Sequence, residues 1–312
     1  MIREIRGKVT KGLGGLYETR AVVDGEVKRF SSRAKGVLKR DEEKVLVGDN
    51  VKLLVDDSTP DVIVISEVEE RKNSLIRPPM ANLDYLFLVF AARKPSPVIE
   101  TVDKLVAIAE HNGIIPVIVV TKSDLGQDIA AELAEIYTSI GIDTFITSSD
   151  SGEGVDALSA YVREHLRGGM TAAFAGASGV GKSTLMNALF PELSLATGDI
   201  SHKIERGKHT TRHVEIFDIG SGDDVGFLAD TPGFSLIDFA RFDFFTLEEL
   251  LPTFRELLPY VGKCRYADCA HVGESVDECA VARAASEGKI PTTRLESYRS
   301  IYRTLKSKSA YT

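Results

Sequence analysis

The sequence predicts an α/β protein built from three consecutive parts, and three observations support this. Short runs rich in Val and Ile, separated by turn residues, fill residues 1–70. Over residues 71–240, apolar runs typical of buried strands alternate with amphipathic segments typical of helices. All three cysteines lie between residues 264 and 279, within a final part, 241–312, that we expect to be α-helical.

Composition places the chain among ordinary globular proteins. Its 312 residues are 43% hydrophobic and 27% charged. No run approaches the length of a membrane span and no signal-peptide core is present, so we expect a cytoplasmic protein with no membrane partner. The net charge of −8 argues against nucleic-acid binding over the whole surface. Residues 1–40 nevertheless hold eleven Lys and Arg against four Asp and Glu, a local charge of +7.

Residues 1–70 are typical of a small closed β-barrel, and an OB-type barrel fits their length. Turn signals such as Asp24-Gly25 separate the apolar runs. The basic surplus lies in the first half and includes an expected loop, Ser31–Arg40. This surplus is either a solvated face or a surface that contacts RNA phosphates, with too few aromatic residues for base stacking. The expected strands are Ile2–Val9, Tyr17–Val23, Val45–Val47, Val51–Val55 and Val62–Val68.

After a linker, Arg71–Met80, the pattern predicts a doubly wound α/β domain. Ligands of such domains bind at the carboxyl ends of the strands. The last two strands, separated by Gly220-Ser221-Gly222-Asp223, are expected to form a hairpin. The expected strands are Leu83–Phe90, Ile114–Val120, Asp143–Ile146, Thr171–Ala175, Val214–Ile219 and Val225–Ala229. The expected helices are Val98–His111, Asp128–Ile140 and Val155–Leu166.

A phosphate-loop pattern follows the strand at Thr171–Ala175: Gly176, Ala177, Ser178, Gly179, Val180, Gly181, Lys182, Ser183 and then Thr184. Its glycines let the backbone curl so that consecutive N–H groups face phosphate oxygens. We expect Lys182 to contact the terminal phosphates and Ser183 to bind Mg²⁺, at the start of a helix that Pro191 ends. The alternative is a chance Gly-rich turn, which this context disfavours.

Polar residues end two of the expected strands. Asp124, in Thr121-Lys122-Ser123-Asp124, can accept hydrogen bonds from the N1–H and the 2-amino group of guanine, neither of which adenine offers. The stem of Lys122 can cover the base, and Ser148, in Thr147-Ser148-Ser149, lies in a segment that resembles the loop contacting the guanine 6-oxo group. Such short motifs occur by chance, but beside a phosphate loop they predict GTP binding.

Two further segments follow the phosphate loop. Thr211, in Gly207-Lys208-His209-Thr210-Thr211-Arg212, could close over Mg²⁺ and the γ-phosphate. In Asp230-Thr231-Pro232-Gly233, Asp230 would hold Mg²⁺ through water and the Gly233 N–H would contact the γ-phosphate. Phe234 then stands where many GTPases place a Gln that orients the attacking water, so slow intrinsic turnover is expected.

The order of these motifs is unusual, because the guanine motif precedes the phosphate loop. Circular permutation accounts for this order, since domain termini often lie close together. With TKSD, GASGVGKST, GKHTTR and DTPGF in this order, the sequence resembles the circularly permuted GTPases of ribosome assembly, and most of all the ribosome small-subunit-dependent GTPase A family, over nearly the whole chain. Thr121 departs from the commoner Asn, which we expect to weaken one contact while leaving the Asp124 readout.

The resemblance implies a circularly permuted P-loop GTPase domain between an N-terminal OB-type barrel and a C-terminal helical zinc-binding domain. It implies a monomeric GTPase that binds the small ribosomal subunit and its rRNA, acts in late maturation, and hydrolyses GTP to GDP and phosphate under stimulation by the subunit. It suggests His209 as a catalytic residue beside Lys182; the alternative is a solvent-facing loop histidine. Because the chain runs from Asp230 directly into the C-terminal part, we expect nucleotide state to move that part.

Cys264-x₄-Cys269-x-His271-x₇-Cys279 contains all the cysteines of the chain. Three thiolates and an imidazole suit tetrahedral Zn²⁺ with every position filled, which predicts one structural ion. The alternative is a set of unrelated buried cysteines, which their clustering disfavours. The family has the same Cys, Cys, His, Cys order, with a gap before Cys279 about two residues shorter. Helices are expected at Asp243–Leu258 and at Thr292–Lys308, the latter either a second RNA-contacting face or a solvated one.

Two other functional classes remain open from the residues alone. A P-loop ATPase, or a kinase of a small substrate, would share the phosphate loop and the Mg²⁺ site; competition between guanine and adenine nucleotides separates it from a GTPase. A non-hydrolysing RNA-binding scaffold is the second, and an absence of turnover even with ribosomal subunits would favour it.

Overall fold

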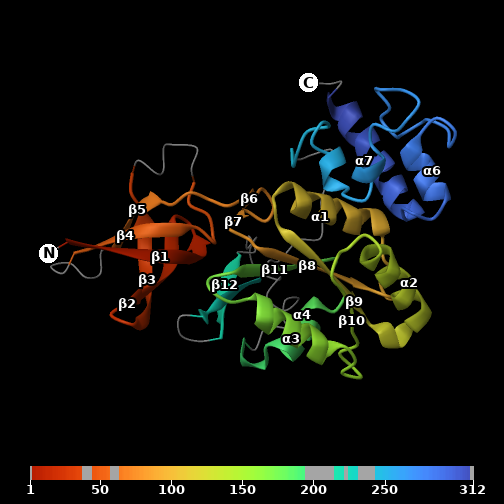
Figure 1. The fold of residues 1–312 in the computed structure, drawn as a ribbon. Helices are drawn as coiled ribbons and strands as arrows, with labels where there is room; N and C mark the ends of the chain where they lie inside the picture. Colours follow the sequence, from red (N-terminus) through yellow and green to blue (C-terminus); the bar gives the residue numbers. More distant parts are fainter. Residues whose placement is uncertain are drawn as a thin grey trace, which may run out of the picture. The chain divides into compact units, whose positions relative to one another are not determined.

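The computed structural model describes residues 2–36, 44–56, 63–193, 214–220, 224–230 and 243–309 (Figure 1). The chain divides into two compact units and passes repeatedly from one to the other. The first unit comprises Met1–Tyr85, Tyr161–Phe174 and Ser201–Phe234. The second comprises Leu86–Ala160, Ala175–Ile200 and Ser235–Thr312.

A closed five-stranded barrel occupies the N-terminal part of the first unit. Its order is β1-β2-β3-β5-β4, and β4 pairs back onto β1 to close it. The β3–β5 pair is parallel and its other pairs are antiparallel. Val9, Val51, Leu53 and Ile65 are fully buried inside it. This closure confirms the expected OB-type barrel. The strands are β1 (Ile2–Leu13), β2 (Leu16–Val23), β3 (Glu26–Ala34), β4 (Asn50–Asp56) and β5 (Ile63–Val68).

Two expectations for the barrel strands are wrong. Val45–Val47 is not a strand: Val47 makes only an isolated bridge, to Met80, although its side chain is buried. The missing strand is β3, whose last residues, Ser31–Ala34, were expected to form a loop. Four of its nine residues are charged, so it lacks an apolar pattern, and the ladders to β2 and β5 make it a strand. The remainder of the expected loop, from residue 37 on, lies outside the described residues.

The first unit continues beyond the barrel. A short ribbon of β6 (Ser74–Leu75) and β7 (Met80–Ala81) follows it. Strand β11 (Thr171–Ala175) then lies parallel to β13 (Gly226–Asp230), while β12 (Glu215–Ile219) is antiparallel to both β13 and β1. The expected hairpin is therefore confirmed, and it joins the barrel through β1.

The second unit contains the expected alternation of strands and helices. Strand β9 (Ile115–Thr121) lies between β8 (Tyr85–Ala91) and β10 (Thr144–Ile146), and β9 and β10 are parallel. Every residue of β8 is buried, as expected for a strand covered on both faces. The helices are α1 (Ile99–His111), α2 (Gln127–Thr138), α3 (Val155–His165, which continues into the first unit) and α4 (Lys182–Leu189).

The C-terminal part of the second unit is irregular before it becomes helical. The expected helix at Asp243–Leu258 is wrong: turns and two short 3₁₀ segments, η5 (Leu251–Thr253) and η6 (Leu258–Tyr260), take its place. Each segment carries a proline, Pro252 or Pro259, near its start, and proline lacks the N–H of an α-helical ladder. Helix α6 (Ala280–Ser286) was not foreseen, whereas α7 (Thr292–Ser309) confirms the expected final helix.

A buried ionic network joins this C-terminal part to the helices of the second unit. Arg294 of α7 donates to Asp103 of α1 and to Glu256, each at 2.7 Å. Tyr137 of α2 donates to the same Asp103 oxygen at 3.0 Å. The Arg294 guanidinium also lies 4.4 Å from the centre of the Phe254 ring. Among the described helices, none is long and apolar enough to cross a membrane.

Candidate nucleotide-binding site and metal centre

The phosphate loop connects β11 to α4, as the sequence predicts. Gly176, Gly179 and Gly181 have φ values of 153°, 80° and 94°, which favour glycine. A Cβ atom on Gly176 would lie 2.0 Å from the carbonyl oxygen of Val89, so no side chain fits there. The backbone N–H groups of this turn therefore lie next to the N-terminus of α4, and a helix N-terminus is a favourable place for an anion.

Lys182 lies over this loop. Its Nζ donates to the carbonyl oxygens of Gly176 and Ala177 at 2.5 and 2.9 Å. The ammonium is thus held at the mouth of the turn, where phosphate oxygens would enter. Ser183, one residue on, is partly exposed in the first turn of α4, and Thr184 beside it is exposed.

Thr121, the last residue of β9, connects the guanine motif to the phosphate loop. Its hydroxyl lies 2.5 Å from the carbonyl oxygen of Val180 and 3.3 Å from that of Phe90. The side chain is 3% exposed, so water does not compete for these carbonyls. A short hydroxyl-bearing residue therefore makes the inter-loop contact at the position where Asn is commoner.

Lys122 lies across the same junction. Its backbone is left-handed, with φ of 56°, a conformation that costs a non-glycine residue about 1 kcal/mol or more. The side chain extends so that Nζ donates to the carbonyl oxygens of Lys94 and Gly179, both at 2.6 Å. The lysine stem therefore bridges the loop after β8 and the phosphate loop, and provides an apolar surface for a flat ring.

Asp124 is oriented by the neighbouring strand end. The buried Ser148 hydroxyl donates to its Oδ1 at 2.6 Å. Ser123 is buried beside it, with its N–H donating to Thr147 O at 3.2 Å and its hydroxyl to Glu153 at 3.0 Å. These bonds fix the direction of the carboxylate before any ligand binds.

A hollow of about 290 Å³ lies between these segments. It brings together the guanine motif, the second strand-end loop and the end of the phosphate loop, as predicted. Sequence reasoning missed Lys94, Leu125 and Asp150; the signal available for two of them is position, since Leu125 directly follows Asp124 and Asp150 directly follows Thr147-Ser148-Ser149. The lining residues are Lys94, Thr121, Lys122, Asp124, Leu125, Ser149, Asp150, Gly181 and Thr184.

Several predicted site residues lie outside the described residues. They are His209 and Thr211 of the threonine loop, and Gly233 and Phe234 after β13. Asp230 is described: it ends β13 in the first unit and is partly buried.

The four predicted metal ligands converge in the second unit. Their ligand atoms, from Cys264, Cys269, His271 and Cys279, all lie within 4.8 Å of one another. The His271 Nδ1 is 3.6, 3.4 and 3.4 Å from the three sulfurs in turn, and the sulfurs of Cys264 and Cys279 are 3.9 Å apart. Tetrahedral ligands about 2.0–2.3 Å from one Zn²⁺ would be roughly 3.5–3.8 Å apart. The group can therefore hold one metal ion.

The surroundings of this group support the same geometry. Backbone N–H groups of Ala280 and Ala282 donate to the sulfurs of Cys264 and Cys279 at 3.3 and 3.4 Å. Arg299 of α7 donates to the carbonyl oxygen of His271 at 3.0 Å. Burial raises the pKa of the Cys279 thiol, so without a cation this thiol stays protonated, and binding a metal would release its proton.

The strand–phosphate loop–helix unit, with a guanine motif earlier in the chain, defines a circularly permuted P-loop GTPase. Comparison with known proteins agrees. The family model described as RsgA GTPase matches residues 68–240, and that of the RsgA N-terminal domain matches residues 6–63. The chain belongs to the RsgA GTPase family, which confirms the resemblance drawn from the motifs.

Relatives extend along the whole chain. The small ribosomal subunit biogenesis GTPase RsgA of Geobacillus sp. (strain WCH70) is 40% identical over 306 residues, 97% of this chain and 98% of the relative. The protein of the same name from Alkaliphilus metalliredigens is 36% identical, over 98% of this chain and 99% of the relative. Among solved structures, YjeQ from Thermotoga maritima aligns with a TM-score of 0.76 at 30% identity, covering 97% and 99% of the two chains. YloQ, a circularly permuted GTPase, aligns with a TM-score of 0.75 at 33% identity, covering 98% and 96%.

Proposed function

We propose that this chain hydrolyses GTP to GDP and phosphate and acts in late maturation of the small ribosomal subunit, which stimulates the hydrolysis. The observation that carries the proposal is the joined pair of motifs, in which Thr121 bonds the guanine-motif strand to the phosphate loop at 2.5 Å. The names of the relatives that align with 97% and 98% of this chain support the ribosomal part. The partners are the small subunit with its rRNA and GTP or GDP, and the protein acts as a cytoplasmic monomer.

The nucleotide would occupy the hollow between the two motifs. Asp124 accepts from the N1–H and 2-amino group of guanine, and the Lys122 stem covers the ring, supported by their positions on the lining. The phosphates lie in the loop Gly176–Gly181, with Lys182 and the first turn of α4 as donors. Ser148 orients Asp124 through its 2.6 Å hydrogen bond.

The magnesium and catalytic roles rest on the motifs and the family. Mg²⁺, bound together with GTP, would be held by Ser183 and Thr211, with Asp230 through water, and would neutralise charge on the transferring phosphoryl group. Lys182 stabilises the same charge. His209 is proposed to act on the attacking water, because Phe234 cannot.

The remaining parts have structural and binding roles. The Cys₃His group holds one structural Zn²⁺, supported by ligand-atom spacings that suit a tetrahedral ion. The barrel formed by residues 1–70 contacts the backbone phosphates of RNA. Residues 71–240 form the permuted GTPase domain, and 241–312 form the zinc-binding domain.

One measurement tests the proposal: GTP hydrolysis by the full-length protein with and without purified small ribosomal subunits. We expect slow turnover alone and a marked increase with subunits, and no increase with large subunits. Unchanged turnover would refute the ribosomal part and leave the GTPase part standing.

A substitution at Asp124 tests the base assignment separately. In Asp124→Asn the side-chain amide can donate to the 2-oxo group of xanthine, so we expect preference to pass from GDP to XDP in a competition assay. An unchanged preference for GDP would mean that Asp124 does not read the base. If instead adenine nucleotides compete equally in the wild type, the ATPase or kinase alternative holds.

A further inference from the structure

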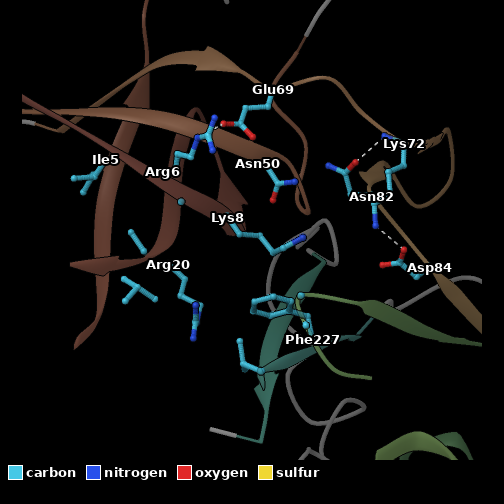
Figure 2. A pocket seen from close by; sticks show the side chains of 16 residues that line it. Ile5, Arg6, Lys8, Arg20, Asn50, Glu69, Lys72, Asn82, Asp84 and Phe227 are labelled. Atoms are coloured by element: carbon cyan, nitrogen blue, oxygen red, sulfur yellow. Dashed lines mark hydrogen bonds and ion pairs between the residues drawn. The ribbon is translucent and has the colours of Figure 1, made fainter. Parts of the chain in front are cut away.

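The barrel and the β12–β13 hairpin of the first unit border an open groove of about 650 Å³ (Figure 2). It is separate from the nucleotide hollow, which is lined by the second unit alone. The lining residues that matter here are four cations, two carboxylates, an amide and one aromatic ring. They are Arg6, Lys8, Arg20, Lys72, Glu69, Asp84, Asn50 and Phe227.

A row of cations crosses the barrel strands at this groove. Lys8 of β1 is paired directly with Arg20 of β2, and Arg20 with Arg29 of β3. Like charges at directly opposed positions of a sheet repel each other and destabilise it. Three in succession therefore need counter-charges.

Carboxylates of this unit neutralise most of these cations. Asp218 of β12 accepts from Arg20 at 2.8 Å and lies 3.4 Å from an Arg29 nitrogen. Arg6, whose side chain is 80% exposed, pairs with Glu69 at 2.9 Å. Each of these guanidinium groups thus has a partner within the unit.

Lys8 is the exception among the cations that line the groove. Lys72 pairs with Asp84 at 2.8 Å. Within the described part of the chain, Lys8 makes no ion pair; its Nζ makes two long hydrogen bonds of 3.4 Å, to the Gly48 carbonyl and the Thr171 hydroxyl. Among the described residues, Lys8 is therefore the lining cation that has no carboxylate within ion-pair distance.

The surroundings of Lys8 include an aromatic ring, two carboxylates and two further cations. In Figure 2 its side chain extends across the groove between Asn50 and Phe227. Its Nζ lies 5.1 Å from the centre of the Phe227 ring, and the Arg20 Cζ lies 5.4 Å from it. Burial lowers the pKa of Lys8 to about 8. The charged groups that face it are Asp49 and Asp84, which raise the pKa, and Lys72, which lowers it, with Arg20 opposite on β2.

The shape and lining of the groove indicate which anion would bind. Phe227 is 4% exposed and has cations near its ring, so no base can stack on it. The other lining cations form ion pairs with carboxylates, so Lys8 and the Asn50 amide are the groups left to recognise an anion. A single ammonium group in an open groove suits a group that brings one negative charge, as each phosphodiester of a nucleic-acid strand does.

We propose that this groove binds one phosphodiester of an RNA strand, with Lys8 as its cation. The proposal rests on the RNA-binding role proposed for the barrel, and it assigns one phosphate contact to Lys8 in this groove. It also gives RNA a contact with β13, the strand that carries Phe227 and ends at Asp230. A phosphate seated here would therefore lie against an element that leads to the predicted Mg²⁺ contact.

The test compares full-length Lys8→Met, Lys8→Arg and Lys52→Met with the wild type. Lys52, on the neighbouring strand β4, pairs with Glu67 and does not line the groove, so it is the matched control. The probe is a fluorescein-labelled 12-nucleotide oligo(A), whose bases do not titrate between pH 7 and 10, and anisotropy is measured between 50 and 200 mM salt. We expect Lys8→Met to bind about tenfold more weakly and to lose about 0.7 from the salt slope, because one phosphate contact is gone. Lys8→Arg and Lys52→Met should bind like the wild type.

A pH series adds a readout that a structural role would not change. A phosphodiester does not titrate between pH 7 and 10, so wild-type affinity should fall as Lys8 deprotonates above pH 8, whereas that of Lys8→Arg should not. Equal affinity of Lys8→Met and the wild type, or equal losses in Lys8→Met and Lys52→Met, would overturn the proposal while RNA binding by the barrel stands. A wild type that does not bind the probe would overturn both.

Discussion

Thr121 provides the sharpest test of how the two nucleotide motifs are joined. Its hydroxyl, 3% exposed, lies 2.5 Å from the Val180 carbonyl of the phosphate loop. Thr121→Val keeps the side-chain shape and removes this donor. The bond is lost and a buried carbonyl is left without its partner, which together cost about 1–3 kcal/mol. If that cost falls on the loop conformation that binds phosphate, GDP affinity drops about 5- to 150-fold.

Thr147 supplies the matched control. It is fully buried at the end of the neighbouring strand, and its hydroxyl donates to the Val120 carbonyl at 3.4 Å, away from the phosphate loop. Thr147→Val should lower the free energy of unfolding but leave nucleotide affinity within about twofold. The assay is titration of a fluorescent GDP analogue with each variant, alongside urea unfolding of each.

The outcome that refutes this reasoning is a Thr121→Val protein that binds GDP as tightly as Thr147→Val. The phosphate loop would then be held by its own glycine turn alone. Thr121→Asn offers a further check, because the longer amide can reach the same carbonyl. Near-wild-type affinity in that variant would mean that the contact, and not the residue type, matters.

Three further expectations follow from the rest of the structure. Arg294→Leu should lower the free energy of unfolding by about 3–5 kcal/mol in urea, because it leaves the buried Asp103 carboxylate without its cation; a loss below 1 kcal/mol would mean that water enters the site. A chelator should release one zinc per wild-type chain, measured with a colorimetric indicator, and Cys269→Ala should be isolated without that zinc. Either change should expose the C-terminal part to protease, whereas Tyr266→Ala in the same loop should keep its metal. Burial lowers the pKa of Lys8 to about 8, so the unfolded chain binds more protons there between pH 8 and 10.5 and the wild type should gain stability over that range relative to Lys8→Met. If the free energy of unfolding changes with pH equally in these two proteins, the pKa of Lys8 is not lowered by folding.

Motifs whose chemistry depends on adjacent residues could be predicted from the sequence. The phosphate loop needs glycines at set positions, and the four metal ligands lie within sixteen residues, so local spacing carries both predictions. The alternation of apolar strands and amphipathic helices predicted the elements from β8 to α3 well for the same reason. Each of those elements buries its own apolar face and so shows its period in its own residues.

Elements stabilised by partners distant in the chain could not be predicted in this way. Strand β3 has a charged sequence and becomes a strand through its ladders to β2 and β5. The expected helix at Asp243–Leu258 has helical spacing, yet Pro252 and packing against α1 produce turns there.

The sequence by itself therefore determined the class of the protein, the order of its motifs and the four residues that can hold a metal ion. Only the tertiary structure decided that Thr121 bonds the phosphate loop, that Arg294 is buried between two acids, and that Lys8 lies in a groove where it has no ion pair with any described residue. The reason is physical: the partners of these three residues lie between 31 and 191 positions away in the chain, and no local pattern records such distances.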